Sequence, residues 1–333
     1  MNIERNFLSR ALIALSVLGL SSIGHAAAAE TYPRRTVSIV VPFPAGGPAD
    51  GTARVLQPAM REVLGQTVIV ENFSGAGGSI GVGKVLAAPP DGHTLLLTTL
   101  AEPILPPRTL PSVTYRPEDL KLVTQLSHTQ LALVARPDAP FKNLKELLAH
   151  TTGKGSASVN YATPGSGTLY HLVSEHFRQL TGAALTHVPY RGIAPEINDL
   201  LGSQVDVAFL PLAGNLTGFI NQGKLRLLGT SGTGPVLHLD RAPSLRTEAA
   251  LKDFDYTVWT GVFVHKDTPD AVVDKVRAAV DAAMKKEAFQ SFIRESGGIP
   301  LRHAQSAGEA GGIYAREVRR LEQVFDVVRL KGS

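Results

Sequence analysis

Short apolar runs alternate with segments of helical periodicity along most of the chain, a pattern typical of an α/β protein. Thr36–Phe43 is a β-branched run that ends in a turn rich in proline and glycine, as buried strands commonly do. Apolar residues then recur every three or four positions over 53–64, which predicts a helix with one apolar face. We expect Asp50 to cap this helix at its N-terminus and Gly65 to end it.

Two more strands follow in the first third of the chain. Thr67–Glu71 and His93–Leu100 are separated by a glycine-rich stretch, Ser74–Gly83, and by a short helix predicted over Lys84–Ala88. Strand, helix, strand, helix and strand within about 65 residues favour a parallel sheet with helices on both faces. Such sheets bind their ligands beyond the carboxyl ends of the strands. The five prolines of Ala101–Pro117 predict an irregular segment.

The same order begins again in the second half of the chain. The strand Ser158–Ala162 leads through the turn Thr163–Thr168 into a helix over Leu169–Leu180. A strand, Gln130–Arg136, and a helix, Asn143–His150, are predicted before this unit. After it the patterns predict the helix Ala194–Leu201, a helix end at Gly218–Gln222, and the strands Leu185–Pro189, Val205–Leu210 and Leu225–Gly229. The chain therefore reads as two α/β units in tandem.

The end of the chain has a different pattern. After the strand Trp259–His265 only helices are predicted, over Pro269–Lys285, Glu287–Ser296 and Gly308–Leu330. Amphipathic helices must bury their apolar faces against another surface. We therefore expect these helices to pack on the first α/β unit.

The composition excludes several classes of protein. The 333 residues are 44% hydrophobic and 19% charged, as in a globular protein. The absence of cysteine excludes disulfides, cysteine-ligated zinc, iron–sulfur clusters and a thiol nucleophile. A net charge of +4 without a long basic run argues against a nucleic-acid partner. The ten histidines lack the spacing of metal motifs, so we expect neither a metal nor a cofactor.

The first 29 residues have the order of a secretory signal peptide. Arg5 and Arg10 precede the apolar run Ala11–Leu20, and small residues follow over Ser21–Ala29. This run has about half the length that a membrane-spanning helix needs. We therefore expect export, with cleavage near Ala29.

One motif raises the alternative of a serine hydrolase. Gly77–Gly81 matches the G-x-S-x-G pattern, which would make Ser79 the nucleophile. The nucleophile of such enzymes follows a strand directly, whereas Ser79 lies eight residues past the strand Thr67–Glu71. A glycine-rich loop with positive φ angles is the simpler interpretation.

Two loops have the composition of anion-binding sites. Phe43–Asp50 and Thr163–Thr168 each join a strand to the N-terminus of a helix, where free N–H donors and the helix dipole attract a carboxylate. Glycine lets a ligand approach the backbone, and Ser166 and Thr168 add hydroxyl groups. Either loop by itself would be an ordinary turn, but two matching loops in an exported protein favour ligand binding.

A series of motifs runs from about Tyr32 to Val328. In the first unit the motifs are VPFPAGGPAD, LGQTVIVEN, SGAGGSIG and PPDGHTLLL; in the second they are NYATPGSGTLYHL, HVPYRG, GSQVDVAF and GKLRLL, followed by WTGVFV. Together these segments resemble the extracytoplasmic solute receptors of the tripartite tricarboxylate transporter system, called the Bug family.

The resemblance implies a type II periplasmic binding protein, an α/β fold with two lobes around a ligand cleft and two crossovers between them. Residues 30–131 and 251–333 would form the first lobe and residues 132–250 the second. The implied function is that of a monomeric periplasmic protein, not an enzyme, which delivers a small carboxylate to membrane transporter subunits. An amino acid, a nicotinate-like acid or a di- or tricarboxylate would be the ligand. A ligand sensor for a two-component system is the alternative.

The resemblance also implies the ligand-binding residues. Phe43, Ala45, Gly46, Gly47 and Asp50 would face Ser166, Gly167 and Thr168 across the cleft, with Thr98 and Thr99 as additional candidates.

Three residues depart from the family's pattern, and one of them is Phe73, which replaces the usual basic residue after Asn72. Pro48 removes a backbone donor and a hydroxyl from the first loop. Glu102 follows the third strand near the expected cleft, where it would repel a second carboxylate or attract an ammonium group.

Overall fold

A computed structural model describes residues 32–153, 155–156, 158–232, 236, 239 and 242–328, so the predicted signal peptide lies outside the described residues. The strands are β1 (Val37–Val41), β2 (Val68–Asn72), β3 (Thr94–Thr99), β4 (Leu120–Ala135), β5 (Val159–Thr163), β6 (Leu185–Pro189), β7 (Val207–Pro211), β8 (Arg226–Thr230), β9 (Thr257–His265) and β10 (Ile299–Pro300). The helices are α2 (Pro48–Leu64), α3 (Ser79–Leu86), α4 (Pro106–Thr109), α5 (Leu144–Thr151), α6 (Leu169–Thr181), α7 (Ile193–Leu201), α8 (Leu216–Asn221), α9 (Asp270–Met284), α10 (Glu287–Glu295) and α11 (Ala307–Val328).

The first sheet confirms the parallel core predicted from the first unit. β1 lies between β2 and β3 and is parallel to both, which the long crossover connections through α2 and α3 make possible. The antiparallel strands β9 and β4, which the apolar pattern did not predict for this sheet, extend it beyond β3. We call this sheet, with α2, α3, α4, α9 and α10, the first lobe.

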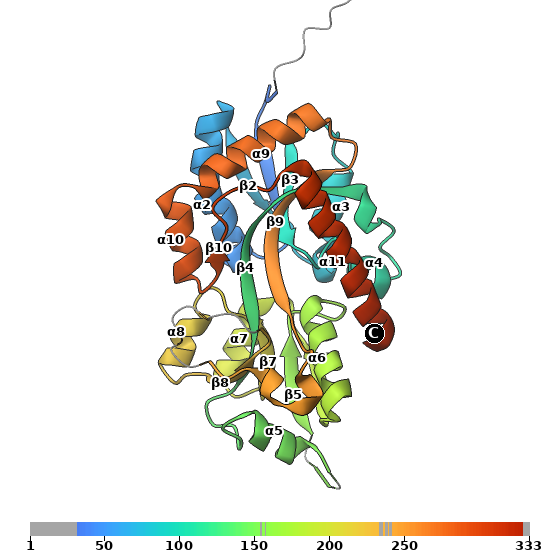
Figure 1. Ribbon diagram of the computed structural model, residues 1–333, viewed down its shortest axis with the longest axis vertical. Helices are drawn as coiled ribbons and strands as arrows, with labels where there is room; N and C mark the ends of the chain where they lie inside the picture. The colour runs from blue at the N-terminus through green and yellow to red at the C-terminus, as the bar shows by residue number, and fades with distance from the viewer. Residues whose placement is uncertain are drawn as a thin grey trace, which may run out of the picture.

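β4 joins the two halves of the molecule. The predicted strand Gln130–Arg136 was too short, because β4 begins ten residues earlier, at Leu120. β4 pairs with β9 over Leu120–Gln130 and then with β7 over Leu131–Ala135. Figure 1 shows β4 and β9 running side by side along the long axis, from one half of the molecule into the other.

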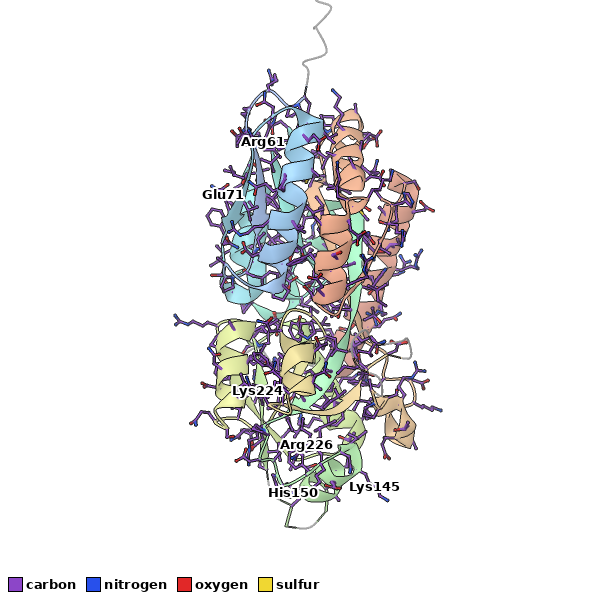
Figure 2. The ribbon with its side chains drawn as sticks, turned by 90° about the vertical axis from the view of Figure 1, so that its left-hand side faces the viewer. Arg61, Glu71, Lys145, His150, Lys224 and Arg226 are labelled. Atoms are coloured by element: carbon purple, nitrogen blue, oxygen red, sulfur yellow. The ribbon has the colours of Figure 1, made fainter. Side chains whose placement is uncertain are left out.

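The second sheet has the order β4-β7-β5-β6, with β8 also paired to β4. β5 is parallel to β6 and β7, whereas β7 is antiparallel to β4. We call this sheet, with α5, α6, α7 and α8, the second lobe. Figure 2 shows the two lobes one above the other, with Arg61 and Glu71 on the first and Lys224 and Arg226 on the second.

The C-terminal helices pack largely as expected. α9 packs on α2 and β4, and α10 packs on α2, so both cover the first lobe. α11 packs on β4 and also on α6 of the second lobe, so it contacts both halves. The prediction of helices only after β9 was wrong in one place, because Ile299 and Pro300 pair with His128 and Ser127 of β4.

Several helix boundaries differ from the predictions. α2 begins at Pro48 with Gly47 as its N-cap, so Asp50 lies in the first turn and is not the cap. Gly65 ends α2 in a left-handed conformation, as predicted. α3 begins at Ser79, five residues before the predicted Lys84, because the glycine-rich stretch turns directly into the helix.

Candidate ligand site at the boundary of the two lobes

The first candidate loop connects β1 to α2 and is held in shape by Asp50. The backbone N–H of Gly46 donates to Asp50 Oδ2 over 2.9 Å, and Arg54 Nε donates to the same oxygen over 2.9 Å. Asn72 Nδ2 donates to Asp50 Oδ1 and to the carbonyl oxygen of Phe43, both over 3.1 Å. These hydrogen bonds join residues on both sides of the loop and fix its conformation.

The electrostatics of Asp50 fit this positioning role. Burial by itself would raise the pKa of Asp50, but hydrogen bonds from Arg54, Gly46 and Asn72 outweigh burial and hold the pKa below its usual range. Asp50 is 3% exposed, and both carboxylate oxygens already accept bonds from its own chain. The exposed part of this loop consists of Pro44, Ala45 and Gly46, with Phe43 and Gly47 half-buried beside it.

The second candidate loop connects β5 to α6 and is capped by Thr168. Thr168 Oγ1 donates to the carbonyl oxygen of Gly165 over 2.7 Å and accepts from the backbone N–H of His171 over 3.4 Å. The Thr168 hydroxyl is thus used within the loop. Ser166, in contrast, is half-buried and takes part in none of the hydrogen bonds of the described residues. Ser166 is therefore the hydroxyl of this loop that has no partner in the described part of the chain.

Three stacked aromatic rings pack beside the second loop. His171 and His187 are parallel within 9°, with their ring centroids 4.0 Å apart, and Tyr161 stacks on His187 at 4.9 Å. The backbone N–H of Gly167 donates to His171 Nδ1 over 3.1 Å, so His171 acts as an acceptor at that atom. Burial and then the charge of His171 lower the pKa of His187 to about 4, which keeps the stack neutral at ordinary pH.

Thr98 and Thr99, the candidates at the end of β3, are bound to Glu102. Thr98 Oγ1, Thr99 Oγ1 and the backbone N–H of Thr99 all donate to Glu102 Oε2, over 2.9, 2.5 and 3.1 Å. Glu102 is 5% exposed. Burial raises its pKa, although the two threonine hydroxyls oppose this effect. The threonines therefore hold an acidic group at the edge of the first sheet.

The two lobes touch at the candidate loops. A Cβ atom added to Gly167 would lie 2.4 Å from Oγ1 of Thr109 in α4. Added to Gly192, before α7, it would lie 3.6 Å from Cγ of Pro44 in the first loop. Residues on both sides of the boundary are thus in close contact, and both candidate loops lie at this boundary.

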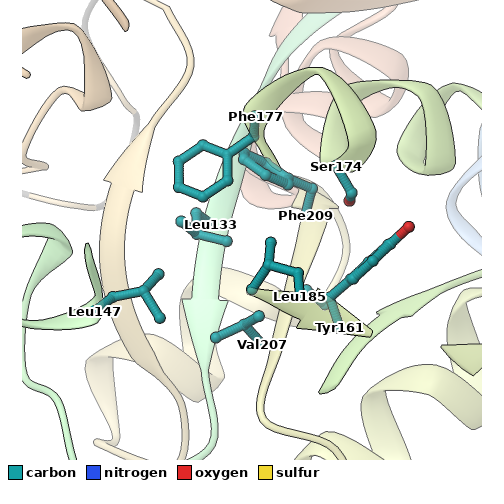
Figure 3. Close-up of a pocket in the computed structure, with 9 residues that line it drawn as sticks. Leu133, Leu147, Tyr161, Ser174, Phe177, Leu185, Val207 and Phe209 are labelled. Carbon is teal, nitrogen blue, oxygen red and sulfur yellow. The ribbon is translucent and has the colours of Figure 1, made fainter. Parts of the chain in front are cut away.

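Two hollows lie away from the boundary. A cavity of about 10 Å³ inside the second lobe is lined mostly by apolar side chains, including Leu133, Phe177 and Phe209 (Figure 3). This is about the volume of one water molecule, so the cavity is a packing void. A surface hollow of about 470 Å³ lies at the C-terminal end of α2, beside Arg61 and Gly65. The N-terminus of that helix, at Pro48, carries the candidate loop at its opposite end.

Ser79 does not have the setting of a hydrolase nucleophile. It begins α3 after a short 3-10 turn in which Gly77 and Gly78 have positive φ angles, and not directly after a strand. Within the described residues, no three His, Cys, Asp or Glu side chains are close enough together to hold a metal ion. No helix of the described part of the chain is long and apolar enough to span a membrane.

Comparison with known proteins identifies the family. Residues 52–324 match the model of the tripartite tricarboxylate transporter family receptor. The chain belongs to this receptor family. Protein BugT of Bordetella pertussis is a relative, 31% identical over 315 residues that cover 93% of this chain and 94% of BugT.

Solved structures of receptors confirm the fold. The periplasmic binding protein BugD has a TM-score of 0.80 and 31% identity, covering 90% of this chain and 99% of BugD. MatC from Rhodopseudomonas palustris, solved with bound malate, has a TM-score of 0.77 and 29% identity, covering 88% of this chain and 99% of MatC. The predicted type II periplasmic binding protein fold, with two α/β lobes, is therefore confirmed.

Sequence reasoning assigned no role to several residues of this receptor. Thr109 carries no local signal, because its importance comes from its contact with the distant Gly167, and His187 stands in the HVPYRG motif without a sign that it stacks on His171. Glu196 could have been singled out from the sequence. It lies between Ile193 and Leu200 at helical spacing, so an acidic residue occupies the apolar face of α7.

Proposed function

We propose that this protein is an exported, periplasmic solute-binding receptor that captures a small carboxylated molecule between its lobes and delivers it to a membrane transporter. One observation carries this proposal: two glycine-containing loops, each leading into a helix N-terminus, lie at one boundary between two lobes. Free N–H groups and helix dipoles from both sides would then converge on one anion. MatC, a relative with the same fold, was solved with malate.

Some residues of the two candidate loops would contact the ligand, and others would only hold the loops in shape. Gly47, Ser166 and the start of α6 would meet the carboxylate, with Ser166 donating its hydroxyl, while Gly46, whose N–H is bonded to Asp50, would let the ligand approach the backbone. Asp50 and Thr168 would act through the loops that they shape, since their polar atoms are bonded within the chain. This assignment refines the set of contacts that the family resemblance implies.

The strands that cross between the lobes provide the hinge. The proposed lobes are 30–131 with 251–333, and 132–250. The first of these divisions is supported by β4, which changes its partner from β9 to β7 after Gln130. The contacts of Thr109 with Gly167 and of Pro44 with Gly192 then belong to a closed arrangement. A ligand that touches both lobes would stabilise this arrangement over an open one.

Delivery to a transporter follows from the receptor family, whose members serve tripartite tricarboxylate transporters. Presenting the bound ligand to a sensor kinase would need the same site. A pull-down from membranes of the source cell, with and without ligand, separates the two functions. Transporter subunits among the captured proteins support delivery, whereas capture of a kinase in their place contradicts it.

A thermal-shift screen of small carboxylates, followed by calorimetry, tests the proposed function. A ligand at 100 times its Kd stabilises the folded state by about 2.7 kcal/mol, which shifts Tm measurably. We expect at least one carboxylate to raise Tm, and Ser166→Ala to weaken its binding. If amino acids, aromatic monocarboxylates, dicarboxylates and tricarboxylates all leave Tm unchanged, the proposal is wrong.

A further inference from the structure

A buried carboxylate in the second lobe has no hydrogen-bond partner. Glu196 lies in the first turn of α7 and is 0% exposed, and neither of its carboxylate oxygens is bonded to any described residue. Burial raises its pKa well above the usual range. A buried carboxyl group without a partner is strongly unfavourable and rare in folded proteins, so Glu196 is a candidate for binding a group from outside the chain.

A second carboxylate lies on the other side of the lobe boundary. Glu102 of the first lobe receives three hydrogen bonds on Oε2 from Thr98 and Thr99, but none of the bonds among described residues reaches its Oε1. Cγ of Glu102 lies 2.5 Å from where a Cβ of Gly78 would be, so the backbone of the glycine-rich segment packs against it. Glu102 is thereby held in place with one oxygen still available.

Tyr170 lies near the same boundary. It lies in the first turn of α6, three residues after Gly167, and is 7% exposed. Burial and then the charges of Glu102 and Glu196 raise the pKa of Tyr170. Its hydroxyl takes part in none of the hydrogen bonds of the described residues.

Packing of the backbone brings the two carboxylates to one segment of the first lobe. A Cβ on Gly78 would lie 2.5 Å from Cγ of Glu102 and 3.6 Å from Cβ of Pro42, and a Cβ on Gly192, the N-cap of the helix that carries Glu196, would lie 3.6 Å from Cγ of Pro44.

The other polar groups at the boundary favour a negative charge, whereas the two carboxylates favour a positive one. The α6 N-terminus and Ser166 attract a negative group, whereas Glu102 and Glu196 attract a positive one. A molecule that carries a carboxylate at one end and an ammonium at the other matches both. A second carboxylate next to Glu102 and Glu196 would instead be repelled.

We propose, on the basis of the proposed function, that Glu196 and Glu102 recognise an ammonium group, so that the ligand is an amino acid or another amine-bearing carboxylate. Glu196 provides both oxygens from the second lobe, and Glu102 provides Oε1 from the first. The ammonium group would therefore bridge the lobes and favour their closure.

Matched pairs of ligands test this inference. L-aspartate and L-malate differ only by an ammonium in place of a hydroxyl, and 4-aminobutyrate and glutarate by an ammonium in place of a carboxylate. Calorimetry on the full-length mature protein should give Kd values at least tenfold lower for the amine-bearing member of at least one pair. Glu196→Gln and Glu102→Gln should each raise that Kd at least tenfold. Glu62→Gln, on the exposed C-terminal part of α2, is the control and should leave it unchanged.

The outcomes separate this inference from the proposed function. If compounds bind but neither pair shows a tenfold preference for its amine-bearing member, the inference fails and the proposed function stands. If no compound of either kind binds, the inference fails, and the wider carboxylate screen then decides the proposed function. Unchanged amine affinity in Glu196→Gln also overturns the inference, because a protonated Glu196 that only donates a hydrogen bond would be replaced well by glutamine.

Discussion

Gly167 of the second lobe lies so close to Thr109 of the first that a Cβ atom on Gly167 would be 2.4 Å from the threonine Oγ1. Gly167 also has a φ angle of +76°, which glycine adopts without strain. This one residue therefore serves two purposes. It lets the second loop turn into α6, and it leaves room for the lobes to meet.

The first prediction concerns this contact. Gly167→Ala should keep the lobes apart and raise the Kd of a proven ligand roughly tenfold or more, equivalent to about 1.4 kcal/mol. Gly182→Ala is the matched control, because Gly182 has a φ angle of +68° but nothing within 4 Å of its added Cβ. Both variants should lose roughly 1–2 kcal/mol of folding stability from backbone strain. Equal ligand affinities in the two variants would show that the contact with Thr109 has no role in closure.

The second prediction separates two hydroxyls of the same loop. Thr168→Ala should lower the free energy of unfolding by about 1 kcal/mol, because α6 loses its N-cap. Ser166→Ala should leave that free energy unchanged and weaken ligand binding by about 1–3 kcal/mol, because the bound carboxylate loses a donor. Urea denaturation and calorimetry measure the two effects. A stability loss in Ser166→Ala with unchanged affinity would reverse the assigned roles.

The third prediction is that replacing Glu196 raises the stability of the empty protein and weakens ligand binding. Glu196→Met fills a similar volume without a buried polar group and should stabilise the empty protein by about 1–3 kcal/mol. Thermal unfolding should show a higher Tm, while binding of amine-bearing ligands should be lost. A lower Tm in the empty Glu196→Met protein would mean that Glu196 has a partner within the fold.

The fourth prediction concerns pH. The unfolded chain protonates His187 near its ordinary pKa of 6.5, whereas the folded protein does so only near 4. The unfolded state therefore binds more protons between these values, and the free energy of unfolding should decrease as pH falls from about 6.5 to about 4. Burial also lowers the pKa of His171, and its protonation would remove the acceptor of the Gly167 N–H, so ligand affinity should weaken as the pH falls.

Urea denaturation at a series of pH values checks this prediction. His187→Gln lacks the titrating ring and should show a shallower decrease than the wild-type protein. If the two profiles run parallel, the buried histidine stack does not account for the acid sensitivity.

Much of the fold was predictable because it depends on local rules. β6 and the start of α6 lie where the apolar pattern placed them, and Gly65 ends α2 as its conformational freedom requires. The predicted start of α3 was wrong. The glycines before Ser79 have the composition of a loop, but the helix begins directly after Gly78. The first half of β4 was missed because its pairing with β9 joins residues far apart in the chain.

The sequence by itself determined where the glycine-containing loops join strands to helices, because periodicity and turn chemistry are properties of neighbouring residues. It also determined the receptor family, because the order of the motifs can be recognised along the chain. The tertiary structure decided which polar atoms those loops leave unused. The hydroxyls of Thr98, Thr99 and Thr168 are bonded within the chain, whereas Ser166 and Glu196 are not. Such differences depend on contacts between the ends of separate strands, and only the folded chain brings those ends together.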